Sequence, residues 1–100
     1  MALRIEWSKQ AQKSLDDLYD FLETKWTEQI IRDFTEKLES KLRLISQNPT
    51  LYKSSARLEG TRECIVTRHN TIFYKYVEGE GKVFIASFWA NYKNPDNLKG

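Results

Sequence analysis

The sequence predicts an α+β fold with the element order β-α-α-β-β-β. Two observations support this prediction. In the first half, apolar residues recur at steps of three and four, as in helices, and three runs rich in β-branched and aromatic residues fill most of the stretch 61–92. We expect the three runs to form an antiparallel meander extended by a short N-terminal strand, with an α-helical hairpin packed on one face.

Length and composition narrow the class of protein. One hundred residues, 40% hydrophobic and 30% charged, are typical of one folded soluble domain, here expected over residues 1–100. No apolar run approaches the roughly 18 residues of a membrane span, and the start does not resemble a secretory signal. Cys64 is the one cysteine and His69 the one histidine, too few for a disulfide or a structural zinc site. We therefore expect a cytoplasmic protein without metal or cofactor.

The opening residues predict a short strand followed directly by a helix. Apolar and charged side chains alternate over residues 3–7, as in a strand with one buried face. Ser8 is a good N-cap, so we expect a helix from about residue 9 to residue 25. Its apolar stripe consists of Ala11, Leu15, Leu18, Leu22 and Trp26.

A second helix is expected after Thr27, which is another N-cap and precedes an acidic first turn. Asn48-Pro49 ends it, because proline disfavours the helical conformation of the residue before it. Its apolar stripe consists of Ile31, Phe34, Leu38, Leu42 and Ile45. Residues 48–60 show neither period, so we expect a loop, and loops of this length are often functional.

The three strand runs are separated by turn-forming sequences at 68–70 and 78–81. In the last run, alternation predicts one face with Val83, Ile85 and Ser87 and the other with Phe84, Ala86 and Phe88. Both faces are then substantially apolar. We expect the face that the helices leave uncovered to bind a partner.

Charge differs between the two halves of the chain. Residues 1–50 carry eight Lys or Arg against nine Asp or Glu, whereas residues 51–100 carry eight against five. The basic half is a weak indication of an anionic partner, either nucleic acid or an acidic peptide, and a solvated surface gives the same count equally well.

In the order and spacing of these elements the chain resembles the RelE/ParE superfamily, the toxins of bacterial type II toxin-antitoxin modules. The features that carry the resemblance are the strand 3–7 with Ser8, the helix end at Asn48-Pro49, the strand pair 62–66 and 72–76, and a last strand leading to Asn94-Pro95 and Leu98. The resemblance implies a growth-inhibiting, plasmid-stabilising toxin and a cognate antitoxin protein. It leaves open a possible homodimer or a toxin-antitoxin hetero-oligomer.

The superfamily contains two kinds of toxin, and fold alone does not separate them. RelE-like toxins cleave mRNA on the ribosome, and ParE-like toxins inhibit DNA gyrase by binding it. Where the nucleases carry a central arginine this chain has Thr71, and where relatives often have an arginine after the last strand it has Tyr92 and then Lys93. We therefore predict a ParE-like gyrase inhibitor.

Two alternatives remain open. The first is an mRNA endonuclease with Arg62, Arg68, His69 and Tyr92 as its cation and proton-transfer set. The second is a degenerate toxin fold that serves as an interaction module. Structural explanations also exist for single residues, since His69 suits a turn and a thiol such as Cys64 in an apolar strand is usually inert.

The resemblance also suggests which residues meet the antitoxin or the target. They are Lys53, Arg57, Arg62, Tyr74, Tyr76, Trp89, Tyr92 and Lys93. We expect an antitoxin segment, disordered when alone, to place apolar residues in the groove between helices and sheet. Its acidic residues would face Arg57, Arg62 and Arg68.

Overall fold

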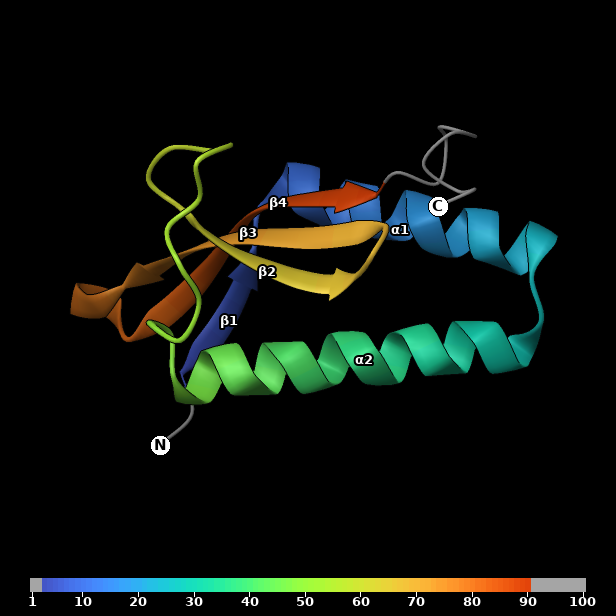
Figure 1. Ribbon diagram of the computed structural model, residues 1–100, viewed down its shortest axis with the longest axis horizontal. Helices are drawn as coiled ribbons and strands as arrows, with labels where there is room; N and C mark the ends of the chain where they lie inside the picture. The colour runs from blue at the N-terminus through green and yellow to red at the C-terminus, as the bar shows by residue number, and fades with distance from the viewer. Residues whose placement is uncertain (1–2, 91–100) are drawn as a thin grey trace.

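The elements follow one another as predicted. In the computed structural model, which describes residues 3–90, they are β1 (Arg4–Trp7), α1 (Lys9–Lys25), α2 (Glu28–Gln47), β2 (Arg62–Thr67), β3 (Asn70–Val77), a 3-10 turn (Glu78–Glu80) and β4 (Lys82–Ala90). The sheet order is β1-β4-β3-β2, with β1 parallel to β4 and the other pairs antiparallel. The tip of the α1–α2 hairpin extends past the end of the sheet (Figure 1). The predicted α+β class is confirmed.

Both helices begin at the predicted capping residues. The Ser8 hydroxyl accepts a hydrogen bond from the Ala11 N–H at 3.0 Å, and the Thr27 hydroxyl accepts one from the Ile30 N–H at 3.3 Å. α2 ends at Gln47, directly before Asn48-Pro49. The predicted helix boundaries are therefore correct, because side chains next to each helix end satisfy free backbone groups or stop the helix.

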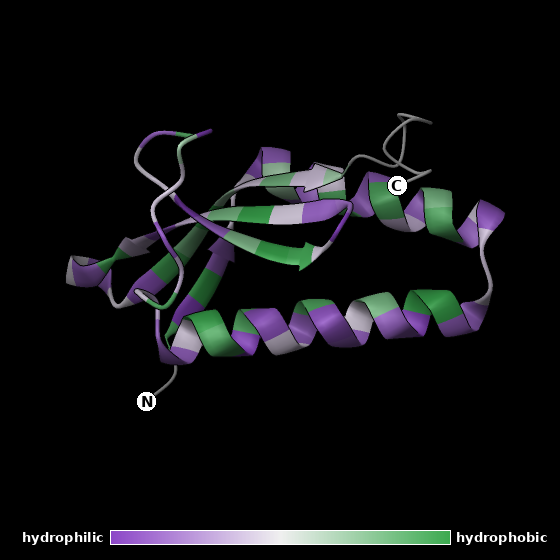
Figure 2. Ribbon diagram, viewed as in Figure 1, coloured by the Kyte–Doolittle hydropathy of each residue, from purple (hydrophilic) through white to green (hydrophobic). Residues whose placement is uncertain are grey.

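The hydrophobic core lies on one face of the sheet. Hydrophobic and hydrophilic residues alternate along the helices and strands (Figure 2). The core joins the helical stripes to one side of the sheet, and its members are Ala11, Leu18, Leu22, Phe34, Leu38, Ile45, Cys64, Val66, Ile72, Tyr74, Val83, Ile85 and Phe88. Both helices thus cover the same side, and we call the opposite side the outer face.

The predicted alternation of β4 is wrong after Ile85. Phe73 pairs with Ser87 while Tyr74 pairs with Ile85, so Ala86 has no partner on β3 and forms a β-bulge. The bulge reverses the faces that follow. Phe88 is therefore in the core with Ile85, 2% exposed, and packs against Phe34 at a ring distance of 6.5 Å.

Ser8 joins the bulge to the start of α1. Its hydroxyl donates to the Ala86 carbonyl at 2.9 Å, and its backbone N–H donates to the Ile85 carbonyl at 2.9 Å. β1 pairs with β4 only as far as Ile85. One serine thus ends β1, begins α1 and bonds the carbonyl at the bulge of β4.

The segment 48–61 between α2 and β2 is attached to the sheet at several points. The Tyr74 hydroxyl donates to the Pro49 carbonyl at 2.8 Å, and the Glu63 N–H donates to the Lys53 carbonyl at 3.1 Å. Gly60 adopts a left-handed φ of 83°, which favours glycine. The expected loop is confirmed, and it is held by the buried Tyr74 in the middle of β3 and by Glu63 of the edge strand β2.

A small polar cluster is buried beneath this loop. Cys64 is completely buried, and its thiol is a hydrogen-bonding neighbour of the Tyr52 hydroxyl. Burial raises the pKa of the Cys64 thiol above its ordinary 9.0, and burial is also the main reason that the pKa of Tyr52 is raised to about 12. The thiol is therefore neutral near pH 7, as the sequence led us to expect of an inert cysteine.

Replacing Ser8 with alanine should destabilise the fold more than replacing the second N-cap. Ser8→Ala removes two hydrogen bonds, and we expect the free energy of unfolding to fall by about 2 kcal/mol. Thr27→Ala removes one longer bond at an exposed site and should cost about 0.5–1 kcal/mol. Urea unfolding of both variants measures the difference. Equal losses would show that the bond to Ala86 adds nothing.

Cys64→Ala should flatten the loss of stability at alkaline pH. The folded pKa is raised, so the stabilisation is complete below the unfolded pKa and is lost as pH rises. Above about pH 9, the wild type should lose at most about 1.4 kcal/mol per pH unit through this thiol. Urea unfolding between pH 7 and pH 10 should give diverging curves for the two proteins, whereas parallel curves would contradict a raised thiol pKa.

Candidate functional site

A mostly apolar hollow lies where the hairpin extends past the sheet. We call it the hairpin groove, a space of about 480 Å³ between α1, α2 and the β2–β3 turn. Its walls are mostly apolar and include Leu18, Leu22 and Phe34. Trp26 and Ile30 at its rim are 48% and 40% exposed, which is unusual for large apolar side chains.

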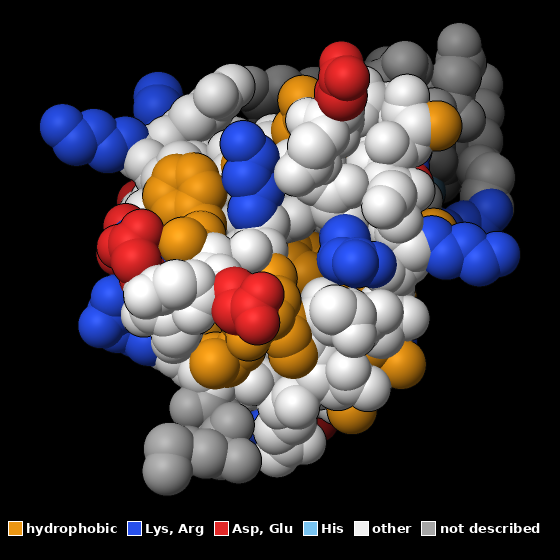
Figure 3. Space-filling view, turned by 90° about the vertical axis from the view of Figure 1, so that its left-hand side faces the viewer, with side chains coloured by type: hydrophobic (Ala, Val, Ile, Leu, Met, Phe, Trp, Pro, Cys, Tyr) orange, Lys and Arg blue, Asp and Glu red, His pale blue; other side chains and the backbone are white. Residues whose placement is uncertain are grey.

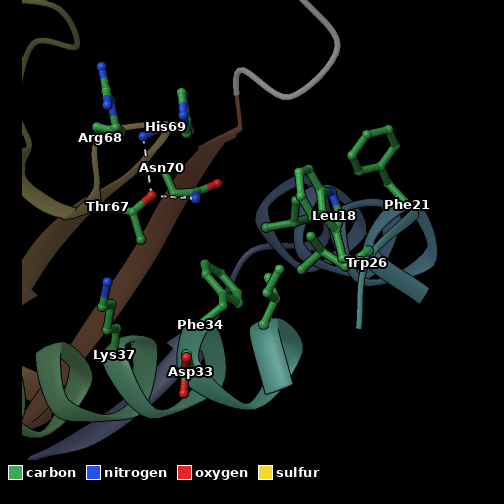
Figure 4. A pocket seen from close by; sticks show the side chains of 12 residues that line it. Leu18, Phe21, Trp26, Asp33, Phe34, Lys37, Thr67, Arg68, His69 and Asn70 are labelled. Atoms are coloured by element: carbon green, nitrogen blue, oxygen red, sulfur yellow. Dashed lines mark hydrogen bonds between the residues drawn. The ribbon is translucent and has the colours of Figure 1, made fainter. Parts of the chain in front are cut away.

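Charged side chains line one border of the hairpin groove. Arg68 and His69 come from the β2–β3 turn, and Asp33 and Lys37 come from α2 (Figure 4). Neither Arg68 nor Lys37 enters an ion pair within residues 3–90. The border therefore has two cations available to an acidic partner.

Asn70 carries an unpaired polar atom in the wall of this groove. Its side-chain N–H₂ donates to the Thr67 hydroxyl oxygen at 2.7 Å, and that same oxygen accepts the backbone N–H of His69 at 3.1 Å. The Asn70 Oδ1 has no hydrogen-bond partner, although the residue is only 8% exposed. This oxygen points across the groove toward Leu18 (Figure 4).

A second candidate surface is the outer face, which is not left open as expected. The Arg57 guanidinium lies 5.5 Å from the Phe73 ring centroid and 5.2 Å from that of Trp89. The two rings are 4.8 Å apart, and Arg57 also pairs with Glu63 at 2.6 Å. Phe73 is completely buried by these neighbours. Arg57 therefore shields Phe73 from solvent and stacks on the aromatic rings of this face.

Arg62 lies in a third place, a hollow of about 730 Å³ between segment 48–61 and β3. Its guanidinium donates to the Tyr52 carbonyl at 2.6 Å. Tyr74 and Tyr76 line the same hollow, but Tyr74 is completely buried, whereas Tyr76 is 36% exposed. On the face at this end of the sheet, charges of both signs surround hydrophobic side chains (Figure 3).

The residues proposed as a catalytic set are not gathered in one place. Arg62 begins β2, while Arg68 follows its end, so at a strand rise of 3.3 Å per residue the two lie about 20 Å apart. His69 is beside Arg68 in the β2–β3 turn, which agrees with the interpretation of His69 as a turn residue. Tyr92 lies outside the described residues, as do Lys93, Asn94-Pro95 and Leu98.

The expected contact residues that the structure describes lie on the outer face, in the loop hollow and on segment 48–61, and none of them lines the hairpin groove. Trp89 and Arg57 belong to the outer face, and Arg62 and the two tyrosines belong to the loop hollow. Lys53 is exposed, and its carbonyl joins the loop to β2. Among residues 3–90 the structure holds no cluster of three His, Cys, Asp or Glu side chains fit for a metal, and no helix long and apolar enough to cross a membrane.

Sequence reasoning missed the main residues of the hairpin groove. Trp26 and Ile30 carried a signal, because both are large apolar residues beside the helix-helix connection, where few core contacts are available. Asn70 carried none, since it looked like an ordinary turn residue. Only its pairing with Ala90 and Thr67 fixes its side chain on the helix side.

Solved structures of toxins share this fold. A double mutant of the Escherichia coli toxin RelE in the free state has a TM-score of 0.61 at 14% identity, covering 99% of this chain and 93% of that chain. The toxin-antitoxin complex RelBE2 from Mycobacterium tuberculosis has a TM-score of 0.57 at 16% identity, covering 90% and 99%. A conserved hypothetical protein from Helicobacter pylori has a TM-score of 0.57 at 16% identity, covering 90% of this chain and 96% of that chain.

At such identities these structures establish the fold alone. No curated protein matches the sequence significantly. Residues 5–91, however, match the family model described as the ParE toxin of the type II toxin-antitoxin system parDE. The resemblance to the RelE/ParE superfamily is thereby confirmed, and the chain belongs to the ParE toxin family of type II toxin-antitoxin systems.

Proposed function

We propose that this toxin inhibits DNA gyrase by binding it, with no covalent chemistry of its own. One observation supports this choice above others: Arg62 stands at the opposite end of β2 from Arg68 and His69, so the groups available for RNA cleavage do not surround one point. In-line cleavage needs a base, an acid and phosphate-binding cations around one phosphate. Arg62 is moreover occupied by a loop carbonyl, and Arg57 by Glu63 and two aromatic rings.

The composition of the outer face supports the same proposal. Thr71, which stands where the nucleases carry a central arginine, lies in a cross-strand row with Ile65 and Trp89. Ile65 is 59% exposed and Trp89 40% exposed, so the row offers a partly apolar surface. Such a surface suits a protein target better than a phosphodiester.

An antitoxin fits the distribution of these surfaces. The hairpin groove and the loop hollow lie at opposite ends of β2 and β3, and the outer face is on the side of the sheet away from the helices. A segment that is disordered alone and wraps around the toxin could reach all three. We propose that its apolar residues enter the hairpin groove and its acidic residues face Arg68 and Lys37.

Expression of the gene alone in bacteria should arrest growth and induce DNA-damage signalling. Gyrase trapped on DNA produces breaks, whereas a ribosomal nuclease produces cut mRNA, so mRNA ends should stay unchanged after induction. Growth curves, a damage reporter and mapping of mRNA ends measure the three responses. Cuts at fixed codon positions would replace the proposal with the endonuclease, and a harmless protein would favour an interaction module.

A charge placed in the hairpin groove should weaken the antitoxin. Ile30→Glu introduces a carboxylate at an exposed apolar position, and we expect the dissociation constant of the antitoxin to rise about tenfold or more. Ile65→Glu places the same charge on the more exposed outer-face residue and is the matched control. Titration calorimetry measures both. An equal or larger effect at Ile65 would move the main contact to the outer face.

A further inference from the structure

We infer that the hairpin groove recognises one indole side chain in the antitoxin segment, whose N–H donates to Asn70 Oδ1. This inference rests on the proposed neutralisation by an antitoxin, and it adds the chemistry of the central contact. The observation behind it is the polar atom in the groove wall that no neighbour satisfies. We call this point the Asn70 acceptor.

The Asn70 acceptor is unusual among the buried polar atoms. Within residues 3–90 no other buried side-chain nitrogen or oxygen lacks a partner. Asn70 is fixed by the backbone pairs of β3 with β2 and β4, and its amide nitrogen is held by Thr67 at 2.7 Å. The oxygen is therefore held in place on the groove side (Figure 4), and because the atom itself is shielded from solvent, a donor reaches it when neighbouring side chains of the groove wall move aside. A buried acceptor that is fixed and unpaired is poised for a donor from outside.

The walls around the Asn70 acceptor select the kind of donor. Leu18, Leu22 and Phe34 come from the two helices and offer apolar contact, and the groove volume of about 480 Å³ suits a large side chain. An ammonium or guanidinium group would be desolvated there, and Asp33, the carboxylate in the groove lining, lies on the α2 border four residues from the competing cation Lys37. A hydroxyl would bring an acceptor oxygen of its own. An indole combines a large apolar ring with a single N–H and no acceptor.

The border of the groove indicates what should flank the indole. Arg68 is exposed on the turn, Lys37 is exposed on α2, and neither is paired within the described residues. Carboxylates on either side of the anchor would meet these cations, although Asp33 limits this preference on the α2 side. We therefore infer an antitoxin segment with a tryptophan between acidic residues.

Small probes test the recognition without the antitoxin. N-acetyl-tryptophanamide carries the indole N–H, and its 1-methyl analogue lacks it but keeps the ring. Titrated into the full-length ¹⁵N-labelled protein, the first should bind with a dissociation constant on the order of 1 mM. The second should bind about tenfold more weakly, because the Asn70 acceptor stays unpaired. The largest shifts should fall on the Asn70 side-chain amide and on Leu18.

Two variants assign the preference to Asn70. Asn70→Leu should bind both probes alike, and its amide spectrum shows whether it remains folded. Gln47→Leu changes an exposed side-chain amide at the end of α2 in the same way and should keep the wild-type preference. The wild-type comparison of the two probes stands even if Asn70→Leu does not fold.

Three results would overturn the inference: equal affinity of the wild type for both probes, shifts outside the groove, or no binding at millimolar concentration. The growth experiment does not influence this outcome. A harmless toxin with an N–H preference would refute gyrase inhibition while keeping the indole site. A growth-arresting toxin without that preference would refute the indole site alone.

Discussion

The hydroxyl of Ser8 is the contact on which the arrangement of helices and sheet depends. It accepts the N–H of Ala11 and donates to the carbonyl of Ala86, so it belongs at once to the first turn of α1 and to the bulge of β4. Because the bulge reverses the side-chain alternation, Phe88 points to the helices and Trp89 to the outer face. Without the bulge, Phe88 would be exposed and the contact between the sheet and Phe34 would be lost.

From this junction the two faces of the sheet take different roles. The helix face forms the core where the helices lie over strands, and it becomes the hairpin groove where the helices extend past the sheet (Figure 1). The outer face is closed over Phe73 by Arg57 and Trp89. Among residues 3–90, the apolar surface left for partners includes the hairpin tip, around Trp26 and Ile30, and the row that ends at Ile65.

Features that depend on interactions between residues close in sequence could be predicted. Ser8, Thr27 and Asn48-Pro49 act on the backbone within a few residues, so the helix boundaries were predictable. The bulge at Ala86 was not, because its carbonyl bonds a serine 78 positions away. The same holds for the site. Arg62 and Arg68 were assigned to one catalytic set, but they lie at opposite ends of β2 in the structure. The unpaired oxygen of Asn70 was likewise not predictable, because it is unpaired only when no residue from another part of the chain donates a hydrogen bond to it.

That oxygen is informative because it is costly. A buried acceptor without a partner costs about 1–3 kcal/mol, and a domain of this size has a total stability of only about 5–15 kcal/mol. An apolar residue at position 70 would avoid this cost, and the hydroxyl of Thr67 already accepts the backbone N–H of His69. The amide therefore has no structural task that requires its oxygen to be unpaired. A partner that donates to it recovers the cost on binding, so the same atom that weakens the isolated toxin strengthens its complex and discriminates among partners.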